Sequence, residues 1–346
     1  MRDAIGRRLR AHPGGAAITV SDAGEFGLIA RIVARLAAGT NAGVVVGPGD
    51  DAAVVASPDG RVVVTTDLVV EGRHFRREWS SAYDVGRRAA ARSLADIAAM
   101  GARPTAIVVG LATPPDLPLE WADGLADGLV DECGLVGAAV VGGDVSADDH
   151  VVLAVTALGD LGGREPVRRA GAVPGDVVVV AGRLGYAAAG LAQFMAGLHA
   201  GRADHELVGA HRRPQVAYAA ASRLAHAGAT AMVDVSDGLV ADLGHVAAAS
   251  GVGIELATDD LPLPAELVEA GLALGVDPLT WVAGGGDDHA FAATMPGDAA
   301  LRAVTLLADL PEPVPFAQVG RVVVGTGVTF VDAPPPGAGG HEHFRA

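Results

Sequence analysis

Four short stretches of the chain place aspartates directly after apolar runs, beside glycine, serine or threonine. They are Gly49-Asp50-Asp51, Thr65-Thr66-Asp67, Gly142-Gly143-Asp144 and Asp234-Val235-Ser236-Asp237-Gly238. A valine-rich run that ends in hydroxyls and carboxylates is a common place for a protein to hold a metal ion or a phosphate. Each stretch alone also fits a polar turn or a helix N-cap. Their repetition favours a shared site.

Aspartates that converge from separate loops repel one another unless cations offset their charge. Ligand sets made only of oxygen select Mg²⁺ or a similar hard ion, and Mg²⁺ usually bridges to substrate phosphates. Phosphoryl transfer asks a protein mainly for positioning and charge neutralisation. The sequence therefore predicts a site where several Mg²⁺ ions assist direct in-line transfer, with no covalent protein nucleophile.

The composition excludes several other classes of protein. The chain has 346 residues, a net charge of −16 and no lysine. A P-loop is excluded because it needs a lysine, and the acidic charge argues against nucleic acid as a partner. Apolar runs end well before 18 residues and the N-terminus has no signal-peptide pattern, so we expect no membrane span. The single cysteine, Cys133, fits a structural thiol in a reducing cytoplasm.

The elements that would position the acids alternate between helix and strand. Ser21-Asp22 offers an N-cap for a helix that continues to Leu36, and Ser81 with Asp84 opens another that ends near Met100. On the second helix, Arg88, Arg92 and Asp96 share one face. That face is either a solvated salt-bridge ladder or one that points Asp96 into a site, where small neighbours let another backbone approach closely. Further strands are expected at 44–46, 52–56, 62–66, 107–111, 138–141 and 151–158, the run Val62-Val63-Val64 being read as buried, and a helix at 119–133.

The second half of the chain reads as a separate α/β unit. The Gly- and Arg-rich segment 162–175 is the expected junction, which gives a flexible tail at 1–20, an N-terminal domain at 21–162 and a C-terminal domain at 163–346. A strand is expected at 176–181 and helices at 183–195 and 216–227. Asp234 and Asp237 flank Ser236 just before a helix; N-capping would explain one acid but not both. Gly284-Gly285-Gly286-Asp287-Asp288-His289 is a further glycine loop with two acids.

In order and spacing, these motifs resemble the thiamine-monophosphate kinase family, in the superfamily that also holds aminoimidazole ribonucleotide synthetase and selenophosphate synthetase. The likeness extends from Gly24-Glu25-Phe26-Gly27-Leu28-Ile29 to about Phe344. Besides the four acid stretches, its most specific parts are 71–75 and 96–101. The resemblance implies a two-domain α/β (α+β type) fold: an N-terminal mixed sheet with helices that dimerises through its sheet, and a C-terminal α/β domain.

The resemblance also implies the reaction, which is transfer of a phosphoryl group from ATP to thiamine monophosphate, giving thiamine diphosphate. The partners implied are ATP, thiamine monophosphate and a second copy of the chain, in the cytoplasm, with no nucleic acid and no membrane. The implied Mg²⁺ ligands are Asp51, Thr65, Thr66, Asp67, Asp96, Asp144, Asp234 and Asp237. The implied ATP contacts are Gly143, Asp144, Arg169 and Ser236, and the implied substrate contacts are His74 and Asp287.

The chain departs from the family's pattern near the substrate. The family usually has Glu at Asp287, Tyr at His289 and Glu at Ala290, and often an aromatic residue at Ala338. The residue that stacks on a thiamine ring is therefore left open, with His341 and Trp281 as alternatives. Two other functions also stay open: another ATP-dependent reaction of the superfamily, and a non-catalytic module that binds nucleotide or metal.

Overall fold

The computed structural model describes residues 17–36, 39, 41–48, 52–198 and 206–332. Asp51, Ala338, His341 and most of the tail expected at 1–20 lie outside the described residues. The chain forms two compact units. The first takes in the chain up to Ala56 with Thr66–Ala90 and Thr105–Thr156, and the second takes in Ser57–Thr65, Ala91–Pro104 and the chain from Ala157 onwards.

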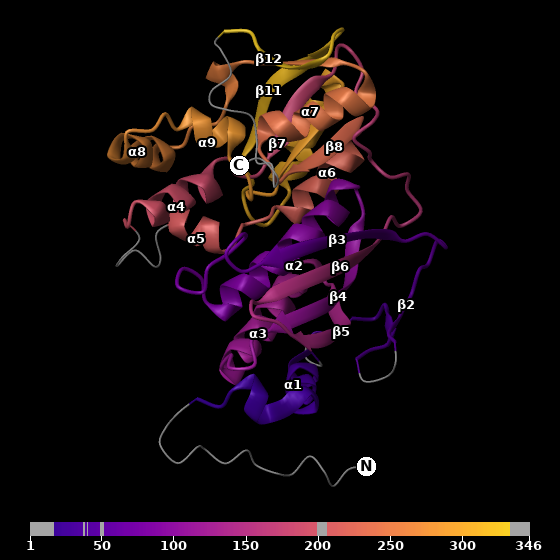
Figure 1. The fold of residues 1–346 in the computed structure, drawn as a ribbon. Coiled ribbons are helices and arrows are strands. Elements are labelled where there is room, and N and C mark those ends of the chain that lie inside the picture. The colour runs from indigo at the N-terminus through magenta and orange to yellow at the C-terminus, as the bar shows by residue number, and fades with distance from the viewer. Residues whose placement is uncertain (1–16, 37–38, 40, 49–51, 199–205, 333–346) are drawn as a thin grey trace. The chain divides into compact units, whose positions relative to one another are not determined.

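A four-stranded sheet organises the N-terminal half (Figure 1). Its strands, in spatial order, are β3 (Val63–Val70), β6 (Val152–Asp160), β4 (Arg103–Thr113) and β5 (Ala139–Ala147). β4 and β5 are parallel, with Ala106 opposite Ala139, and are joined by helix α3 (Leu119–Val136), as parallel neighbours require. A two-stranded ribbon, β1 (Val44–Val46) with β2 (Val54–Val55), precedes the sheet.

Two further helices of this half begin with a reciprocal cap. Helix α2 (Ala82–Ala99) starts as predicted, since Ser81 Oγ donates to Asp84 Oδ2 and the Asp84 N–H donates back to Ser81 Oγ. Helix α1 (Val20–Leu36) is capped in the same way by Thr19 with Asp22, so its predicted start at Ser21 is slightly late. Cys133 in α3 is buried, and burial raises the pKa of its thiol, as expected for a structural cysteine.

Strand β3 differs from the prediction in burial and in length. Val62 and Val64 are 54% and 60% exposed, so the predicted buried run is wrong. β3 is an edge strand, and its residues alternate between one more buried face and one open face. The strand also continues to Val70, which places Thr65, Thr66 and Asp67 inside it and not at its end. β5 likewise continues through Gly142 to Ala147.

The second unit is built on a six-stranded sheet. Its order is β12 (Gly327–Phe330), β9 (Gly253–Leu256), β11 (Phe316–Val323), β7 (Val177–Ala181), β10 (Ala290–Met295) and β8 (Ala231–Val235). The neighbouring strands of this sheet pair antiparallel, except β12 with β9, which are parallel. The strand expected at 176–181 is therefore confirmed, and β8 contains Asp234.

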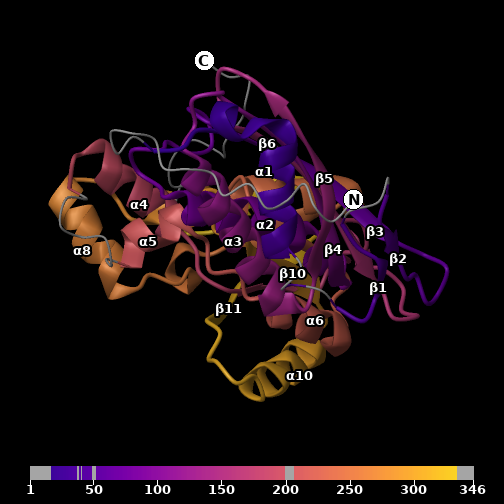
Figure 2. The same ribbon diagram turned by 90° about the horizontal axis from the view of Figure 1, so that it is seen from below.

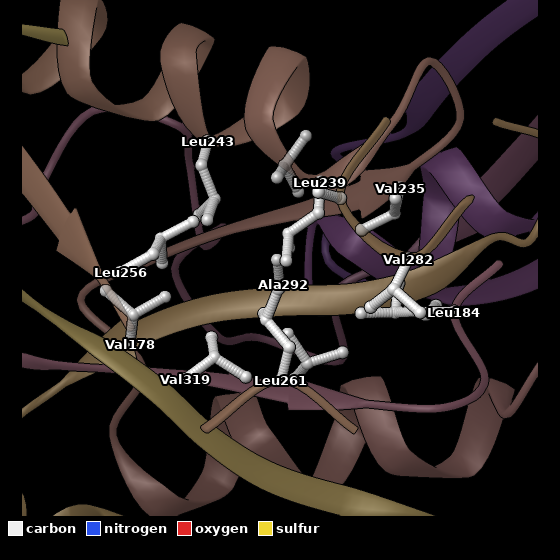
Figure 3. Packing of buried hydrophobic residues seen from close by; sticks show 14 of the residues in the cluster. Val178, Leu184, Val235, Leu239, Leu243, Leu256, Leu261, Val282, Ala292 and Val319 are labelled. Carbon is white, nitrogen blue, oxygen red and sulfur yellow. The ribbon is translucent and has the colours of Figure 1, made fainter. Parts of the chain in front are cut away.

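Helices cover both faces of this sheet. Along β7, Val178 and Val180 belong to one hydrophobic cluster, whereas Val179 and Ala181 belong to another. The first cluster, shown in Figure 3, includes residues of α4 (Tyr186–Met195), α7 (Leu239–Ser250), α8 (Ala265–Leu274) and α9 (Leu279–Gly284). The second includes α6 (Tyr218–Ala227) and α10 (Gly297–Ala308), which lie side by side in Figure 2. A short helix α5 (Glu206–Arg212) packs against α4.

Small residues allow the close packing that the sequence suggested at the end of α2. Ala98 and Ala99 join the cluster formed with α6, and the Val167 N–H donates to the Met100 carbonyl over 3.0 Å. Throughout the parts of the chain that the structure describes, no helix is long and apolar enough to cross a bilayer.

Candidate functional site

The most buried acid of the predicted site is Asp234 on β8. Asp234 is 3% exposed and lies opposite Phe291 of β10 in the register of the sheet. The carboxylate is not left alone in the core, because Oδ2 accepts a hydrogen bond from Nδ1 of His289 over 2.9 Å. An ionised carboxylate is stable at this depth only when it is paired or bound to a cation.

Asp242, in the first turn of α7, fixes the loop that follows β8. Its Oδ2 accepts the backbone N–H groups of Ser236, Asp237 and Gly238 at 3.0, 3.0 and 3.1 Å. Burial raises the pKa of Asp242 to about 7, although these N–H donors oppose the shift. The N-cap residue of α7 is Gly238, which makes no side-chain cap, so the capping role considered for Ser236 or Asp237 is not found.

The loop at 284–289 lies directly against the loop at 234–238. The Asp287 N–H donates to the Ser236 carbonyl over 2.8 Å, and the His289 N–H donates to the Val235 carbonyl over 2.9 Å. Two glycines permit this contact: a Cβ at Gly286 would lie 2.4 Å from the Ser236 oxygen, and one at Gly238 would lie 2.7 Å from the Gly284 oxygen. The two acid motifs of the second half are therefore joined by backbone hydrogen bonds and close packing.

Asp287 and His289 are held in an unfavourable backbone conformation. Their φ angles are 63° and 53°, and they are the non-glycine residues with positive φ among those that the structure describes. Such a conformation costs on the order of 1 kcal/mol or more for each residue, and it persists only where the surroundings enforce it. Asp287 is also anchored through its side chain, since NH1 of Arg92 donates to Oδ1 over 2.6 Å.

His289 is fully buried and has only one ring nitrogen hydrogen-bonded. Burial lowers its pKa, but the hydrogen bond and the charge of Asp234 outweigh burial, so the pKa of His289 lies above its ordinary value. Nδ1 donates to Asp234. Nε2 is buried and has no hydrogen-bond partner within the described part of the chain; it lies 4.0 Å from Oδ1 of Asp287, too far for a hydrogen bond.

Asp288, between these two residues, has a different role. Its carboxylate accepts the backbone N–H groups of Gly185 and Ala187 at 2.5 and 2.8 Å, and so holds the start of α4. Burial raises the pKa of Asp288 to about 7 against the effect of these donors. Neither Asp242 nor Asp288 had a role predicted from the sequence. The position of Asp242 in the first turn of a helix is the one signal that could have suggested its role.

The face of α2 that carries Arg92 and Asp96 contacts segments that are distant in the sequence. Arg92 binds Asp287, and Asp96 Oδ2 accepts a hydrogen bond from Thr65 Oγ1 over 2.7 Å. These contacts reach beyond the helix itself, and a role for Asp96 in a site stays a prediction. Arg169 is an exposed residue, and its carbonyl accepts a hydrogen bond from Ser250 Oγ.

The first compact unit carries the remaining predicted residues. Thr66 and Thr156 are joined through their hydroxyls over 3.1 Å. Asp144 lies on β5 beside Gly143, where a Cβ would come within 2.1 Å of the Val109 oxygen, so Gly143 permits the close pairing of β5 with β4. His74 Nδ1 accepts the Val70 N–H over 3.0 Å, which leaves the ring proton on Nε2.

The residues predicted to bind metal are oxygen donors without exception. No three His, Cys, Asp or Glu side chains within the described ranges lie close enough together to hold a metal ion by themselves. Mg²⁺ commonly takes one or two carboxylates and completes its shell with water and phosphate oxygens, so this donor set fits it. Asp234 fits best, because it is a buried carboxylate whose orientation is fixed. Trp281 is 7% exposed within the core, which argues against it as a stacking surface for a ligand.

Comparison with known proteins identifies the class. The AIR synthase related protein N-terminal domain matches residues 49–161, and the corresponding C-terminal domain matches residues 173–333. The chain therefore belongs to the AIR synthase related family, as its two α/β units and acid motifs suggested.

Within this family, the chain is a member of the thiamine-monophosphate kinases, a group of enzymes. It is 45% identical over 317 residues to the thiamine-monophosphate kinase of Mycobacterium tuberculosis H37Rv, covering 91% of this chain and 89% of that protein. The thiamine-monophosphate kinase structure from Stenotrophomonas maltophilia K279a superposes with a TM-score of 0.77 at 35% identity, over 89% of this chain and 96% of that one. The structure of AaThiL complexed with AMPPCP and TMP superposes with a TM-score of 0.70 at 30% identity, over 93% of this chain and 98% of that one.

Proposed function

We propose that the protein transfers the γ-phosphoryl group of ATP directly to thiamine monophosphate, giving thiamine diphosphate and ADP. The observation that carries this proposal is the identity with curated thiamine-monophosphate kinases over most of the chain. A structural neighbour of the same kind binds AMPPCP, an ATP analogue, together with TMP. The interlocked acid loops at 234–238 and 284–289 supply the oriented carboxylates that such a site needs.

We assign the cation-binding role to the oxygen donors Asp51, Thr65, Thr66, Asp67, Asp96, Asp144, Asp234 and Asp237. Bound Mg²⁺ would neutralise the phosphate charges. Thr65 and Thr66 are successive residues of β3, so their side chains point to opposite faces. On the other face, the Thr66 hydroxyl lies 3.1 Å from that of Thr156.

The remaining assignments concern the two substrates. Gly143, Asp144, Arg169 and Ser236 would contact ATP, with the N–H groups at 236–238 held in place by Asp242. His74 suits a phosphate contact because its Nδ1 is occupied by the Val70 N–H, and Nε2–H is then the donor. Asp287, held by Arg92, would contact thiamine monophosphate. We propose transfer without a covalent phosphoenzyme: Cys133 is buried, the chain has no lysine, and carboxylates that hold a cation would be poor nucleophiles.

We further propose a cytoplasmic homodimer that forms through the open face of the N-terminal sheet. Val64 and Leu68 lie on that face of β3, on either side of Thr66, and are 60% and 58% exposed. Large apolar side chains grouped on a sheet face mark an association surface, and a second copy of the chain would cover it. Light scattering coupled to gel filtration measures the oligomeric state.

The function itself is tested by incubating the protein with ATP, Mg²⁺ and thiamine monophosphate and separating the products by chromatography. Thiamine diphosphate should form, and free thiamine should be a much poorer acceptor. ATP binding without any thiamine diphosphate would reject the kinase proposal. Such a result would favour another reaction of the superfamily or a non-catalytic nucleotide-binding module.

A further inference from the structure

His289 connects the two acid loops of the second unit, and none of the assignments above gives it a role. Its ring donates to Asp234 from Nδ1, and its backbone N–H donates to Val235 in the adjacent strand. Its neighbour Asp287 is fixed to Ser236 through its backbone and to Arg92 through its side chain. One residue therefore touches the buried carboxylate and belongs to the loop that is proposed to reach the substrate.

The geometry around His289 restricts the ring to one position. The residue is 2% exposed, and its φ of 53° is enforced by the hydrogen bonds on both sides of it. A residue kept in this conformation directs its side chain differently from the same residue in an ordinary strand. The strained backbone is thus what aims Nδ1 at Oδ2 of Asp234.

The hydrogen bonding of the ring differs from that of a residue that serves only to fill the core. Buried polar groups are normally all hydrogen-bonded. Among the residues that the structure describes, Nε2 has no hydrogen-bond partner, whereas Nδ1 donates to Asp234 over 2.9 Å. The hydrogen bond that this buried ring makes therefore goes to Asp234, and it fixes the orientation of that carboxylate.

We propose that His289 is a positioning residue for the cation that accompanies the nucleotide. By holding Oδ2 of Asp234, it presents the other carboxylate oxygen to that cation and keeps the carboxylate in one rotamer. This inference rests on the proposed function, because it takes Asp234 as a cation ligand. Hydrogen-bond partners of metal ligands commonly change metal affinity by about 10- to 100-fold when they are lost.

The test measures Mn²⁺ binding by electron paramagnetic resonance in the presence of a non-hydrolysable ATP analogue, with no thiamine monophosphate. His289→Asn keeps an N–H donor near the position of Nδ1, and asparagine tolerates positive φ. His289→Leu removes the donor but fills the space. His289→Gly removes the donor and relieves the backbone strain. Thr294→Val is the matched control, because it breaks a buried hydrogen bond between Thr294 of β10 and Thr230 without touching Asp234.

The Leu and Gly variants should both raise the Mn²⁺ dissociation constant by about 10- to 100-fold. The Asn variant should stay within about threefold of the wild type, and Thr294→Val should lower thermal stability without changing the dissociation constant. The inference is overturned if the Leu and Gly variants bind Mn²⁺ as tightly as the wild type, if only one of them is weakened, or if Asn is as weak as Leu. It is also overturned if Thr294→Val weakens binding equally, or if the wild type binds no Mn²⁺ with the analogue.

The proposed function can fail separately from this inference. A wild-type protein that binds Mn²⁺ with the nucleotide analogue but forms no thiamine diphosphate would reject the kinase assignment. The effect of the His289 variants on Mn²⁺ affinity would still be measurable and would still decide the role of His289.

Discussion

Asp242 provides the sharpest test of how the nucleotide loop is built. A single oxygen of its carboxylate accepts three backbone N–H groups, and the residue is 2% exposed. Asp242→Ala removes the acceptor and leaves three partly or fully buried donors without it. At about 1 kcal/mol for each hydrogen bond, the expected loss in the free energy of unfolding is about 3 kcal/mol.

Asp242→Asn tests the role of the hydrogen-bond acceptor separately from that of the negative charge. The amide oxygen can take the place of Oδ2 and accept the same three donors, although less strongly than a carboxylate. The substitution also removes a buried charge that Asp234 and Asp237 repel. We therefore expect Asp242→Asn to lose about 1 kcal/mol or less, well under the loss in Asp242→Ala.

Urea denaturation followed by circular dichroism measures both variants against the wild type. Asp309→Ala is the control, since Asp309 is an exposed acid at the end of α10. The reasoning is refuted if Asp242→Ala loses less than about 1 kcal/mol, or if the Asn and Ala variants lose equal amounts. Either result would mean that the three N–H groups find other acceptors and that Asp242 does not shape the loop.

Three further predictions concern the cation and the pH response. Asp67→Asn should lower turnover by about 10²- to 10³-fold, because it removes a charge proposed to hold the cation, while Asp116→Asn, at an exposed turn, should change turnover little; equal losses would reject the assignment of Asp67. The raised pKa of Asp288 means that the folded protein binds a proton more tightly than the unfolded chain, so its contribution to stability is present below about pH 4 and is lost as the pH rises to about 7; in Asp288→Asn this part of the pH dependence of urea unfolding should disappear, and an unchanged profile would argue against it. Mg²⁺ with an ATP analogue at about 100-fold above its dissociation constant should stabilise the protein by about 2.7 kcal/mol, more than the sum of the shifts given by Mg²⁺ alone and by analogue with chelator; simple additivity in thermal melts would argue against one shared site.

Local sequence patterns predicted most of the helices and strands. The Ser81 and Asp84 pair located the start of α2 because a capping box is a contact between residues three apart. The same logic missed the start of α1, where Thr19 and Asp22 form the box. The burial of Val62–Val64 was predicted wrongly, since a run of valines does not reveal whether its strand lies at the edge of a sheet.

The sequence nominates residues for the candidate site but not the contacts that they make. The acid motifs indicate the family through their order and spacing alone, because both are properties of the linear chain. The sequence could not show that Thr65 binds Asp96 or that Arg92 binds Asp287, because these partners are 31 and 195 residues apart. The boundary expected between residues 162 and 163 stays a prediction, as does the full set of cation ligands.

The sequence by itself determined the chemistry that is available: oxygen donors in repeated acid motifs, no lysine, and small residues where segments must approach closely. The tertiary structure decided the hydrogen-bonding role of each buried aspartate. Asp234, Asp242 and Asp288 are all buried aspartates in similar glycine-rich surroundings, yet one pairs with His289 and the other two accept backbone N–H groups. The role of a carboxylate depends on the donors that surround it. The donors to Asp234 and Asp288 are 55 and 103 residues away and meet them only in the folded unit, whereas Asp242 meets its donors in the loop just before its own helix.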